Sequence, residues 1–93
     1  MKNKNKKTIV EIYSKAFCVY CTHAKNLLDN KRVSYREIRV DLNEDKLDEM
    51  IKRCGKRTVP QIFINDENIG GFSELSQLER SGSLNTLLTY SRR

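Results

Sequence analysis

The sequence predicts a single α/β domain in which one mixed sheet carries helices on both faces. Short runs of β-branched and aromatic residues alternate with longer runs whose apolar residues recur at helical spacing, in the order βαβαββα. A chain of 93 residues also has the size of one domain rather than two. These observations indicate a small, layered fold.

The first half of the sheet is predicted to come from a strand–helix–strand unit. Residues 8–14 are mostly β-branched or aromatic and, apart from Glu11, apolar on both faces, which suits a central strand. Residues 20–31 show helical spacing, and residues 33–40 return to a strand pattern. Because the two strands are joined by a helix, we expect them to be parallel.

The second half is predicted to contain a helix and a hairpin. Asn43 is placed to cap a helix that runs to Cys54 and is ended by Gly55. Residues 59–64 and 67–70 are strand-like and flank a turn-rich dipeptide, which is typical of a β-hairpin.

Two helices are expected to complete the domain. Ser73 can cap a helix that ends at Gly82, and Ser83 can start a short final helix that carries three leucines.

The net charge of +6 lies in the two ends of the chain. Residues 1–7 contain four lysines and residues 92–93 are arginines, with no acidic residue in either stretch. Between residues 8 and 91, twelve basic residues balance twelve acidic ones. We therefore expect a mobile basic tail at 1–7, one domain at 8–93, and no dedicated nucleic-acid site.

Neither a membrane span nor a secreted scaffold is expected. No apolar run approaches the roughly 20 residues that a spanning helix requires, and the segment after the basic start is too short and charged for a signal peptide. Three cysteines leave one thiol over after one pairing, which argues against a secreted disulfide framework. The sequence thus favours a cytoplasmic protein.

Two cysteines stand where the first strand gives way to the first helix. If Cys18 opens that helix, Cys18 and Cys21 are neighbours about 5–6 Å apart, within reach of a disulfide. Free backbone N–H groups at the helix start would favour the Cys18 thiolate, and Lys15 adds a positive charge. This placement predicts a nucleophilic thiol backed by a second thiol that can close on it.

Zinc binding is the alternative for a C-x-x-C pair. A closed zinc site needs four ligands, and the other candidates are His23 and Cys54. His23 lies on the outward side of the first helix and Cys54 belongs to an apolar stripe, so neither forms a second pair. We expect no metal site, and a buried Cys54 rather than a regulatory thiol.

Two further motifs leave alternatives open. Pro60 is either an edge-strand or turn proline, or part of a cis peptide that frees the Val59 backbone to pair with an extended peptide. Gly70-Gly71 is either a simple turn or a place where free N–H groups meet a carboxylate. If residues 58–60 face Cys18, Arg57 and Lys15 would form a basic rim suited to a small anionic thiol.

Together, the segments Cys18-Val19-Tyr20-Cys21, Thr58-Val59-Pro60 and Gly70-Gly71 resemble the glutaredoxins, most of all the small dithiol type of bacteria. The resemblance covers residues 8–90. It implies a thioredoxin-like fold with a four-stranded mixed sheet, and glutathione-dependent exchange on protein and low-molecular-weight disulfides, including deglutathionylation. It also implies a monomer whose co-substrate is glutathione and whose partners are disulfide-bearing or glutathionylated proteins.

The resemblance further implies individual roles. Cys18 would be the nucleophile and Cys21 the resolving thiol. The residues expected to contact glutathione are Lys15, Tyr20, Arg57, Thr58, Val59, Pro60, Gly71, Phe72 and Ser73. Among them, Lys15 and Arg57 would lie near the glycine carboxylate, Val59 would pair with the cysteinyl backbone ahead of a cis Pro60, and residues 71–73 would receive the γ-glutamyl end.

Two positions depart from the glutaredoxin pattern. Val19 stands where proline is usual, which motivates an alternative function: two chains that hold a [2Fe–2S] cluster through Cys18 and glutathione. Ser73-Glu74 stands where two aspartates are common, and Ser73 lacks a charge for the γ-glutamyl ammonium. A thioredoxin-type reductase that does not use glutathione is a third alternative, against which the basic rim and Gly70-Gly71 argue.

Overall fold

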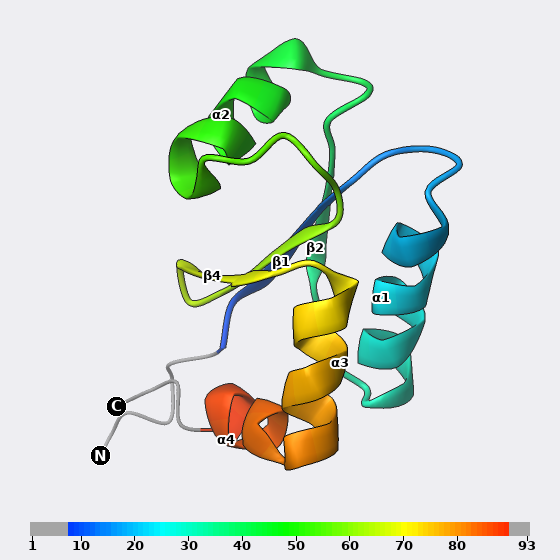
Figure 1. Cartoon of the computed structure of the whole chain (residues 1–93), viewed down its shortest axis with the longest axis vertical. Coiled ribbons are helices and arrows are strands. Elements are labelled where there is room, and N and C mark those ends of the chain that lie inside the picture. The colour runs from blue at the N-terminus through cyan, green and yellow to red at the C-terminus, as the bar shows by residue number, and fades with distance from the viewer. Residues whose placement is uncertain (1–7, 90–93) are drawn as a thin grey trace.

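The computed structural model describes residues 8–89; the basic stretch 1–7 and Arg92-Arg93 lie outside the described residues (Figure 1). The elements along the chain are β1 (Val10–Ser14), α1 (Val19–Asn30), β2 (Arg36–Arg39), α2 (Glu44–Cys54), β3 (Gln61–Ile64), β4 (Glu67–Gly70), α3 (Phe72–Ser81) and α4 (Ser83–Thr89). The predicted α/β class with one four-stranded mixed sheet is confirmed.

The strand order in the sheet is β2-β1-β3-β4. Strand β1 pairs in parallel with β2 and antiparallel with β3, which in turn pairs antiparallel with β4. The first strand is therefore central, as its two apolar faces predict. A short loop joins the end of β1 to the start of α1, so Cys18 and Cys21 lie near the C-terminal end of this central strand.

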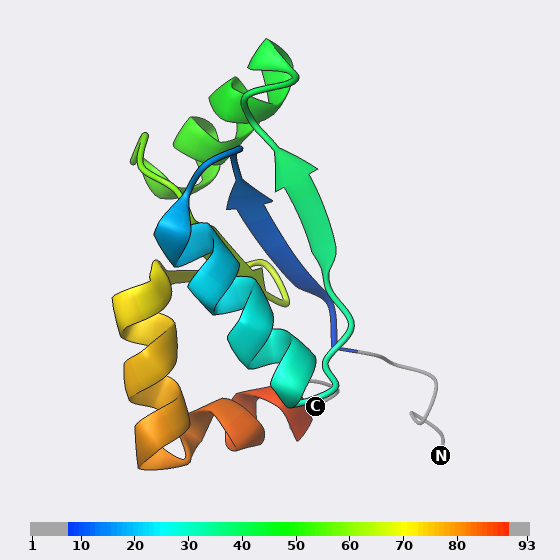
Figure 2. The same cartoon turned by 90° about the vertical axis from the view of Figure 1, so that its right-hand side faces the viewer.

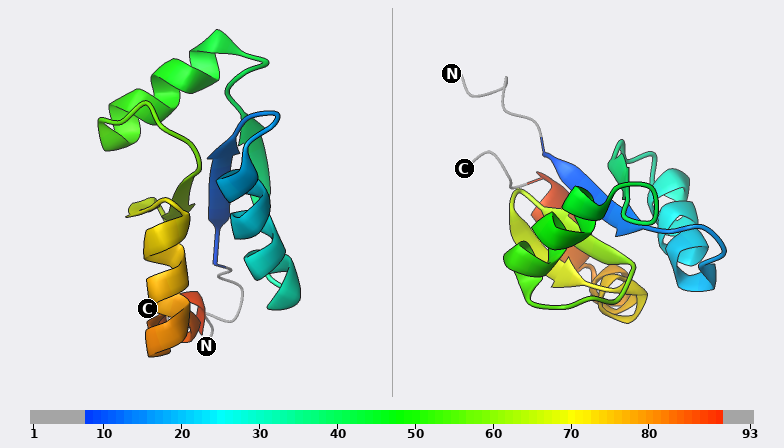
Figure 3. Two further views of the ribbon diagram at one scale, coloured as in Figure 1. Left: turned by 45° about the vertical axis from the view of Figure 1, so that its right-hand side comes forward. Right: turned by 90° about the horizontal axis from the view of Figure 1, so that it is seen from above.

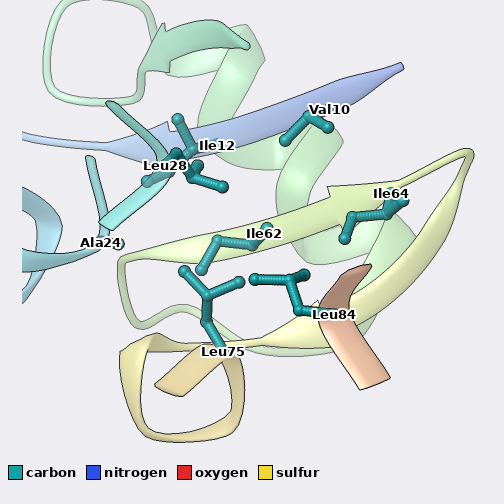
Figure 4. Close-up of a cluster of buried hydrophobic side chains, with 8 residues drawn as sticks. All are labelled: Val10, Ile12, Ala24, Leu28, Ile62, Ile64, Leu75 and Leu84. Carbon is teal, nitrogen blue, oxygen red and sulfur yellow. The ribbon is translucent and has the colours of Figure 1, made fainter. Parts of the chain in front are cut away.

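Helices cover the two faces of the sheet unequally. Figures 1 and 3 show α2 alone on one side, with α1, α3 and α4 gathered on the other. Figure 2 shows α1 and α3 side by side, with α4 crossing near their lower ends. The larger core lies under these three helices and consists of Val10, Ile12, Ala24, Leu28, Ile62, Ile64, Leu75 and Leu84 (Figure 4). The smaller core lies under α2 and consists of Tyr13, Ile38, Met50 and Phe63.

Three boundaries differ from the predicted ones. The strand expected at 33–40 is limited to β2, because the Val33 N–H bonds to the Leu28 carbonyl oxygen (3.0 Å) and so still belongs to the end of α1. The strand expected at 59–64 begins only at Gln61, because Pro60 has no N–H to donate to a ladder. The strand expected at 8–14 begins at Val10.

Helix ends follow local capping rules. Asn43 caps α2 by accepting a hydrogen bond from the Asp45 N–H (2.9 Å), and Gly55 ends it with a left-handed φ of 76°, both as predicted. The prediction that Ser73 caps the next helix is wrong: Gly71 is the N-cap of α3 and the helix starts at Phe72. The Glu74 side chain supplies the cap by accepting the Gly71 N–H (2.9 Å).

Candidate active site

Cys18 lies at the junction between the loop that follows β1 and the start of α1. It is the N-cap residue of α1, in an extended conformation, and its Sγ accepts the Cys21 N–H at 3.2 Å. Cys18 and Cys21 form a disulfide, with Cα atoms 5.2 Å apart. The predicted closeness of the two thiols is thus confirmed.

The two sulfurs differ in their access to solvent. Cys21 is 1% exposed and packs in the interior, while Cys18 is half-buried and lies at the surface. Its neighbours Phe17, Val19 and Tyr20 are all exposed. An incoming thiol or disulfide therefore meets Cys18 first.

The segment before β3 lies beside Cys18, because the end of β1 pairs with the start of the neighbouring strand β3. The Val59 carbonyl oxygen lies 3.9 Å from the Cys18 Sγ, and the Val59–Pro60 peptide bond is cis. The buried Gln61 amide steadies this segment, because its Nε2 donates to the Thr58 carbonyl (3.1 Å) while its Oε1 accepts from Asn68 on β4 (3.2 Å). Of the alternatives for Pro60, the cis form is the one adopted.

A groove of about 410 Å³ runs from this segment to the start of α3. That volume is within the range of small-molecule sites. Seven of the nine residues predicted to contact glutathione line it: Tyr20, Thr58, Val59, Pro60, Gly71, Phe72 and Ser73. Four other residues line the groove: Lys56, Gln61, Gly70 and Glu74. Gly70 and Glu74 stand within motifs noted in the sequence, but none of the four was assigned to the glutathione site.

Lys15 and Arg57 do not line this groove. Both border a neighbouring hollow, which shares Thr58 and Val59 with the groove. Both residues are exposed, and the hollow they share also contains Asp41.

The end of the groove is the N-terminus of α3. Gly70 has a φ of 115°, and a Cβ there would meet the Glu74 Cγ at 3.0 Å, so the chain needs glycine at this position. The pKa of the Glu74 carboxyl is lowered, chiefly by the Gly71 N–H. In the sequence, the hydrogen bond from the Gly71 N–H to Glu74 could have been recognised from a glutamate three residues after the N-cap.

One wall of the groove is aromatic. The rings of Tyr20 and Phe72 stack with centroids 6.1 Å apart and planes 20° apart. His23 packs against both, at 5.9 Å from Tyr20 and 5.5 Å from Phe72. Tyr20 thus lines the groove, and the outward side of α1 contributes His23 to the outside of this wall.

The remaining cysteine lies away from the pair. Cys54 is half-buried rather than buried as predicted, because it is the last residue of α2; it packs against the smaller core with its Sγ 3.7 Å from the Lys56 carbonyl oxygen. Within residues 8–89, no three His, Cys, Asp or Glu side chains are grouped as metal ligands would be. In the same part of the chain, no helix combines the length and apolar character that crossing a membrane requires.

Comparison with known proteins gives one family. The family model for glutaredoxin matches residues 10–69. Glutaredoxin 3 of Escherichia coli is 52% identical over 79 residues, which cover 85% of this chain and 95% of that protein. The fold resembles a buckwheat glutaredoxin–glutathione complex, with a TM-score of 0.80 and 32% identity over 87% of this chain and 76% of that one. It also resembles a glutaredoxin from Brucella melitensis, with a TM-score of 0.79 and 38% identity over 91% and 92% of the two chains.

Proposed function

We propose, for a chain that belongs to the glutaredoxin family, that its thiol–disulfide exchange depends on glutathione and runs through Cys18, with Cys21 as the resolving thiol. Family membership and the paired cysteines make the protein a thiol–disulfide oxidoreductase. The observation that carries the finer proposal is the position of the Cys18 sulfur. It is the accessible member of the pair and lies 3.9 Å from the Val59 carbonyl, at the edge of the groove.

The first step forms one S–S bond and breaks another. The Cys18 thiolate attacks the glutathione sulfur of a glutathionylated protein, and the protein sulfur leaves as a thiolate that takes up a proton. Cys18 then carries glutathione as a mixed disulfide. The Cys21 N–H donated to the Cys18 sulfur, at the start of α1, stabilises the attacking thiolate.

Two routes return Cys18 to the thiolate. A second glutathione thiolate attacks the glutathione held on Cys18, which releases glutathione disulfide. Alternatively, the Cys21 thiolate attacks the Cys18 sulfur, expels glutathione and forms the internal disulfide, which two further glutathione molecules reduce. The Cα separation of 5.2 Å supports the second route.

The groove and the basic rim of Lys15 and Arg57 would together give each part of glutathione a counterpart. The backbone of Val59, ahead of the cis peptide, would pair with the cysteinyl residue. Residues 71–73 at the start of α3 would receive the γ-glutamyl end, where backbone N–H groups favour a carboxylate. Lys15 and Arg57, on the basic rim, would attract the glycine carboxylate. The buckwheat relative in complex with glutathione supports this assignment.

We also propose a cytoplasmic, monomeric enzyme formed by a single domain at 8–93, acting on disulfide-bearing or glutathionylated proteins. The redox pair has to be reduced for turnover, and Cys54 is a free thiol. Both features suit a reducing compartment.

The decisive experiment is deglutathionylation of a glutathionylated peptide by wild type, Cys18→Ser and Cys21→Ser, with mass spectrometry of the enzyme. We expect turnover and a glutathione adduct on Cys18 in Cys21→Ser, and no turnover by Cys18→Ser. Circular dichroism of each variant controls for folding. Full activity of Cys18→Ser would contradict the proposal. No turnover and no adduct in any form would favour the cluster carrier that Val19 motivates, and visible absorbance after anaerobic purification would then identify it.

A further inference from the structure

Two side-chain amides connect the outer strand β4 to the segment beside Cys18. The Asn68 Nδ2 donates to the Gln61 Oε1 (3.2 Å), and the Gln61 Nε2 donates to the Thr58 carbonyl oxygen (3.1 Å), which makes an amide relay from β4 to residue 58. We propose that Asn68 and Gln61 are positioning residues for the exchange reaction, and that the relay determines the affinity for the glutathione half of the substrate. The inference rests on the proposed function and adds two residues to which the resemblance assigns no role.

Neither amide is explained by its own strand. Gln61 is the first residue of β3 and is buried like the three apolar residues that follow it. A buried amide costs free energy unless its polar atoms find partners. Asparagine is depleted in strands, yet Asn68 lies within β4, a strand of four residues. Their shared hydrogen bonds give both polar residues a reason to be there.

The direction of the amide relay is fixed at both ends by backbone carbonyl groups. At one end, the Asn68 Nδ2 also donates to the Ile62 carbonyl oxygen (3.4 Å), so Asn68 has to turn its NH2 group toward β3. At the other end, the carbonyl and hydroxyl oxygens of Thr58 both accept from the Gln61 Nε2, at 3.1 and 3.3 Å. Because a carbonyl oxygen can only accept, each amide has one orientation that satisfies all its contacts.

The amide relay reaches the reacting sulfur through one planar peptide. The Thr58 carbonyl belongs to the Thr58–Val59 peptide, so holding its oxygen also fixes the direction of the Val59 N–H. Within residues 8–89 the Val59 N–H donates to no other group, which leaves it for a bound ligand. The Val59 carbonyl oxygen, in the next peptide, lies 3.9 Å from the Cys18 Sγ. The backbone proposed to pair with glutathione is thus held from β4.

Strand β4 therefore supports both ends of the groove. Asn68 holds the Thr58–Val59 peptide through the relay, and β4 itself runs through Gly70 into Gly71 at the start of α3. Loss of the relay should weaken capture of the substrate. It should not change the nucleophile, because the Cys18 sulfur keeps the hydrogen bond from the Cys21 N–H.

Two variants test the relay in the deglutathionylation of a glutathionylated peptide. Gln61→Met keeps a side chain of similar length without hydrogen bonds, and Asn68→Asp has a carboxylate that cannot donate to Gln61. For each we expect KM to rise about fivefold and kcat to change less than about twofold, because binding is lost and the chemical step is not. Alkylation of reduced Cys18 by iodoacetamide, followed by mass spectrometry, should keep its wild-type rate.

The double variant distinguishes a relay from two independent contacts. If Asn68 acts through Gln61, adding Asn68→Asp to Gln61→Met should raise KM no further. Asn65→Asp is the control, since it adds the same charge to the same hairpin and keeps the hydrogen bond that its side-chain oxygen accepts from the Ile9 N–H (2.9 Å). Its KM should stay within about twofold of the wild-type value.

The outcomes separate failure of the relay from failure of the proposed function. Asn68 is exposed, so Asn68→Asp is expected to fold and tests the relay even if Gln61→Met does not fold; urea unfolding monitors both. If wild type turns over the peptide, an unchanged KM in Asn68→Asp would overturn the relay alone, and so would effects that multiply in the double variant. A wild type without turnover would overturn the proposed function as well.

Discussion

The guanidinium carbon of Arg53 lies 3.9 Å from the centroid of the Phe63 ring. This contact joins the last turn of α2 to the central strand β3. Arg53 also donates hydrogen bonds to the hydroxyl of the buried Tyr13 (2.8 Å) and to the carboxylates of Glu11 and Asp66 (2.9 Å each). One side chain therefore connects α2 to both central strands and to the β3–β4 turn. These Arg53 contacts add to the packing of Met50 in the smaller core, which also holds α2 on its face of the sheet.

Arg53→Met should lower the free energy of unfolding by about 2 kcal/mol, because methionine keeps apolar contact with Phe63 but loses the hydrogen bonds to partly buried acceptors. Urea denaturation at pH 7 measures the change. The control is Lys52→Met, at an exposed neighbouring position, which should change stability by less than about 0.5 kcal/mol. Equal effects of the two substitutions would contradict the role assigned to Arg53.

Glu37→Gln should cost about 1 kcal/mol of stability at pH 7, because Ser14 and Lys25 lose an ionised acceptor. The pKa of Glu37 in the folded chain is lowered, first by the Ser14 hydroxyl and then by Lys25. A lowered pKa stabilises the fold fully above the unfolded value of about 4.3, and the contribution is lost as pH falls through the folded value.

The difference between wild type and Glu37→Gln should therefore shrink on going from pH 6 to pH 3, as measured by thermal unfolding across that range. Glu67→Gln, at an exposed position on β4, is the control and should show a small difference throughout. A Glu37→Gln penalty that stays constant down to pH 3 would show that the carboxylate charge does not contribute.

Gly55→Ala should destabilise the chain by about 1 kcal/mol, through the backbone alone. Gly55 ends α2 with a φ of 76°, and a Cβ there would meet no atom within 4 Å. The melting temperature should fall by about 4–8 °C for a domain of this size. The melting temperature of Gly55→Asn should fall less than that of Gly55→Ala, since asparagine tolerates the left-handed region. A larger decrease in the asparagine variant would point to a steric cause instead.

Ser73→Asp should lower the KM for glutathione about threefold to fivefold, because it adds a carboxylate where the γ-glutamyl ammonium is proposed to bind. Ser73 lines the groove and is exposed in the first turn of α3, where an added acid also suits the helix dipole. Ser73→Asn has the same size without the charge and is the control. If both variants change KM equally, charge at this position does not determine affinity.

The sequence predicted the parts of the fold that depend on local pattern. The Asn43 and Gly55 ends of α2 and the central position of β1 are set by side chains within a few residues, and all three were correct. The start of α3 was not, because the Glu74 carboxylate caps the helix from inside its first turn and leaves Ser73 a helical residue. Ser73, two residues after Gly71, is an equally plausible cap when only the sequence is known.

In the site, too, the sequence predicted contacts between residues close in the chain but not contacts that the fold creates between distant segments. The pairing of Cys18 with Cys21 followed from their spacing on one helix. The role of Gln61 in the groove wall did not, because it depends on how β3 and β4 meet. The position of Lys56 in that wall depends on the path of the loop between α2 and β3. The separation of Lys15 and Arg57 from the groove likewise depends on how the loop after β1 and the loop before β3 come together.

The central pair of strands carries both halves of the site. Cys18 follows β1, residues 58–60 precede β3, and these two strands are hydrogen-bonded to each other in the middle of the sheet. Fraying of the outer strand β2 can proceed without breaking the pairing of β1 with β3. We therefore expect the Cys18 sulfur and the Val59 carbonyl to stay close while that edge of the sheet opens, so that transient exposure of β2 to proteases or chaperones need not interrupt disulfide exchange.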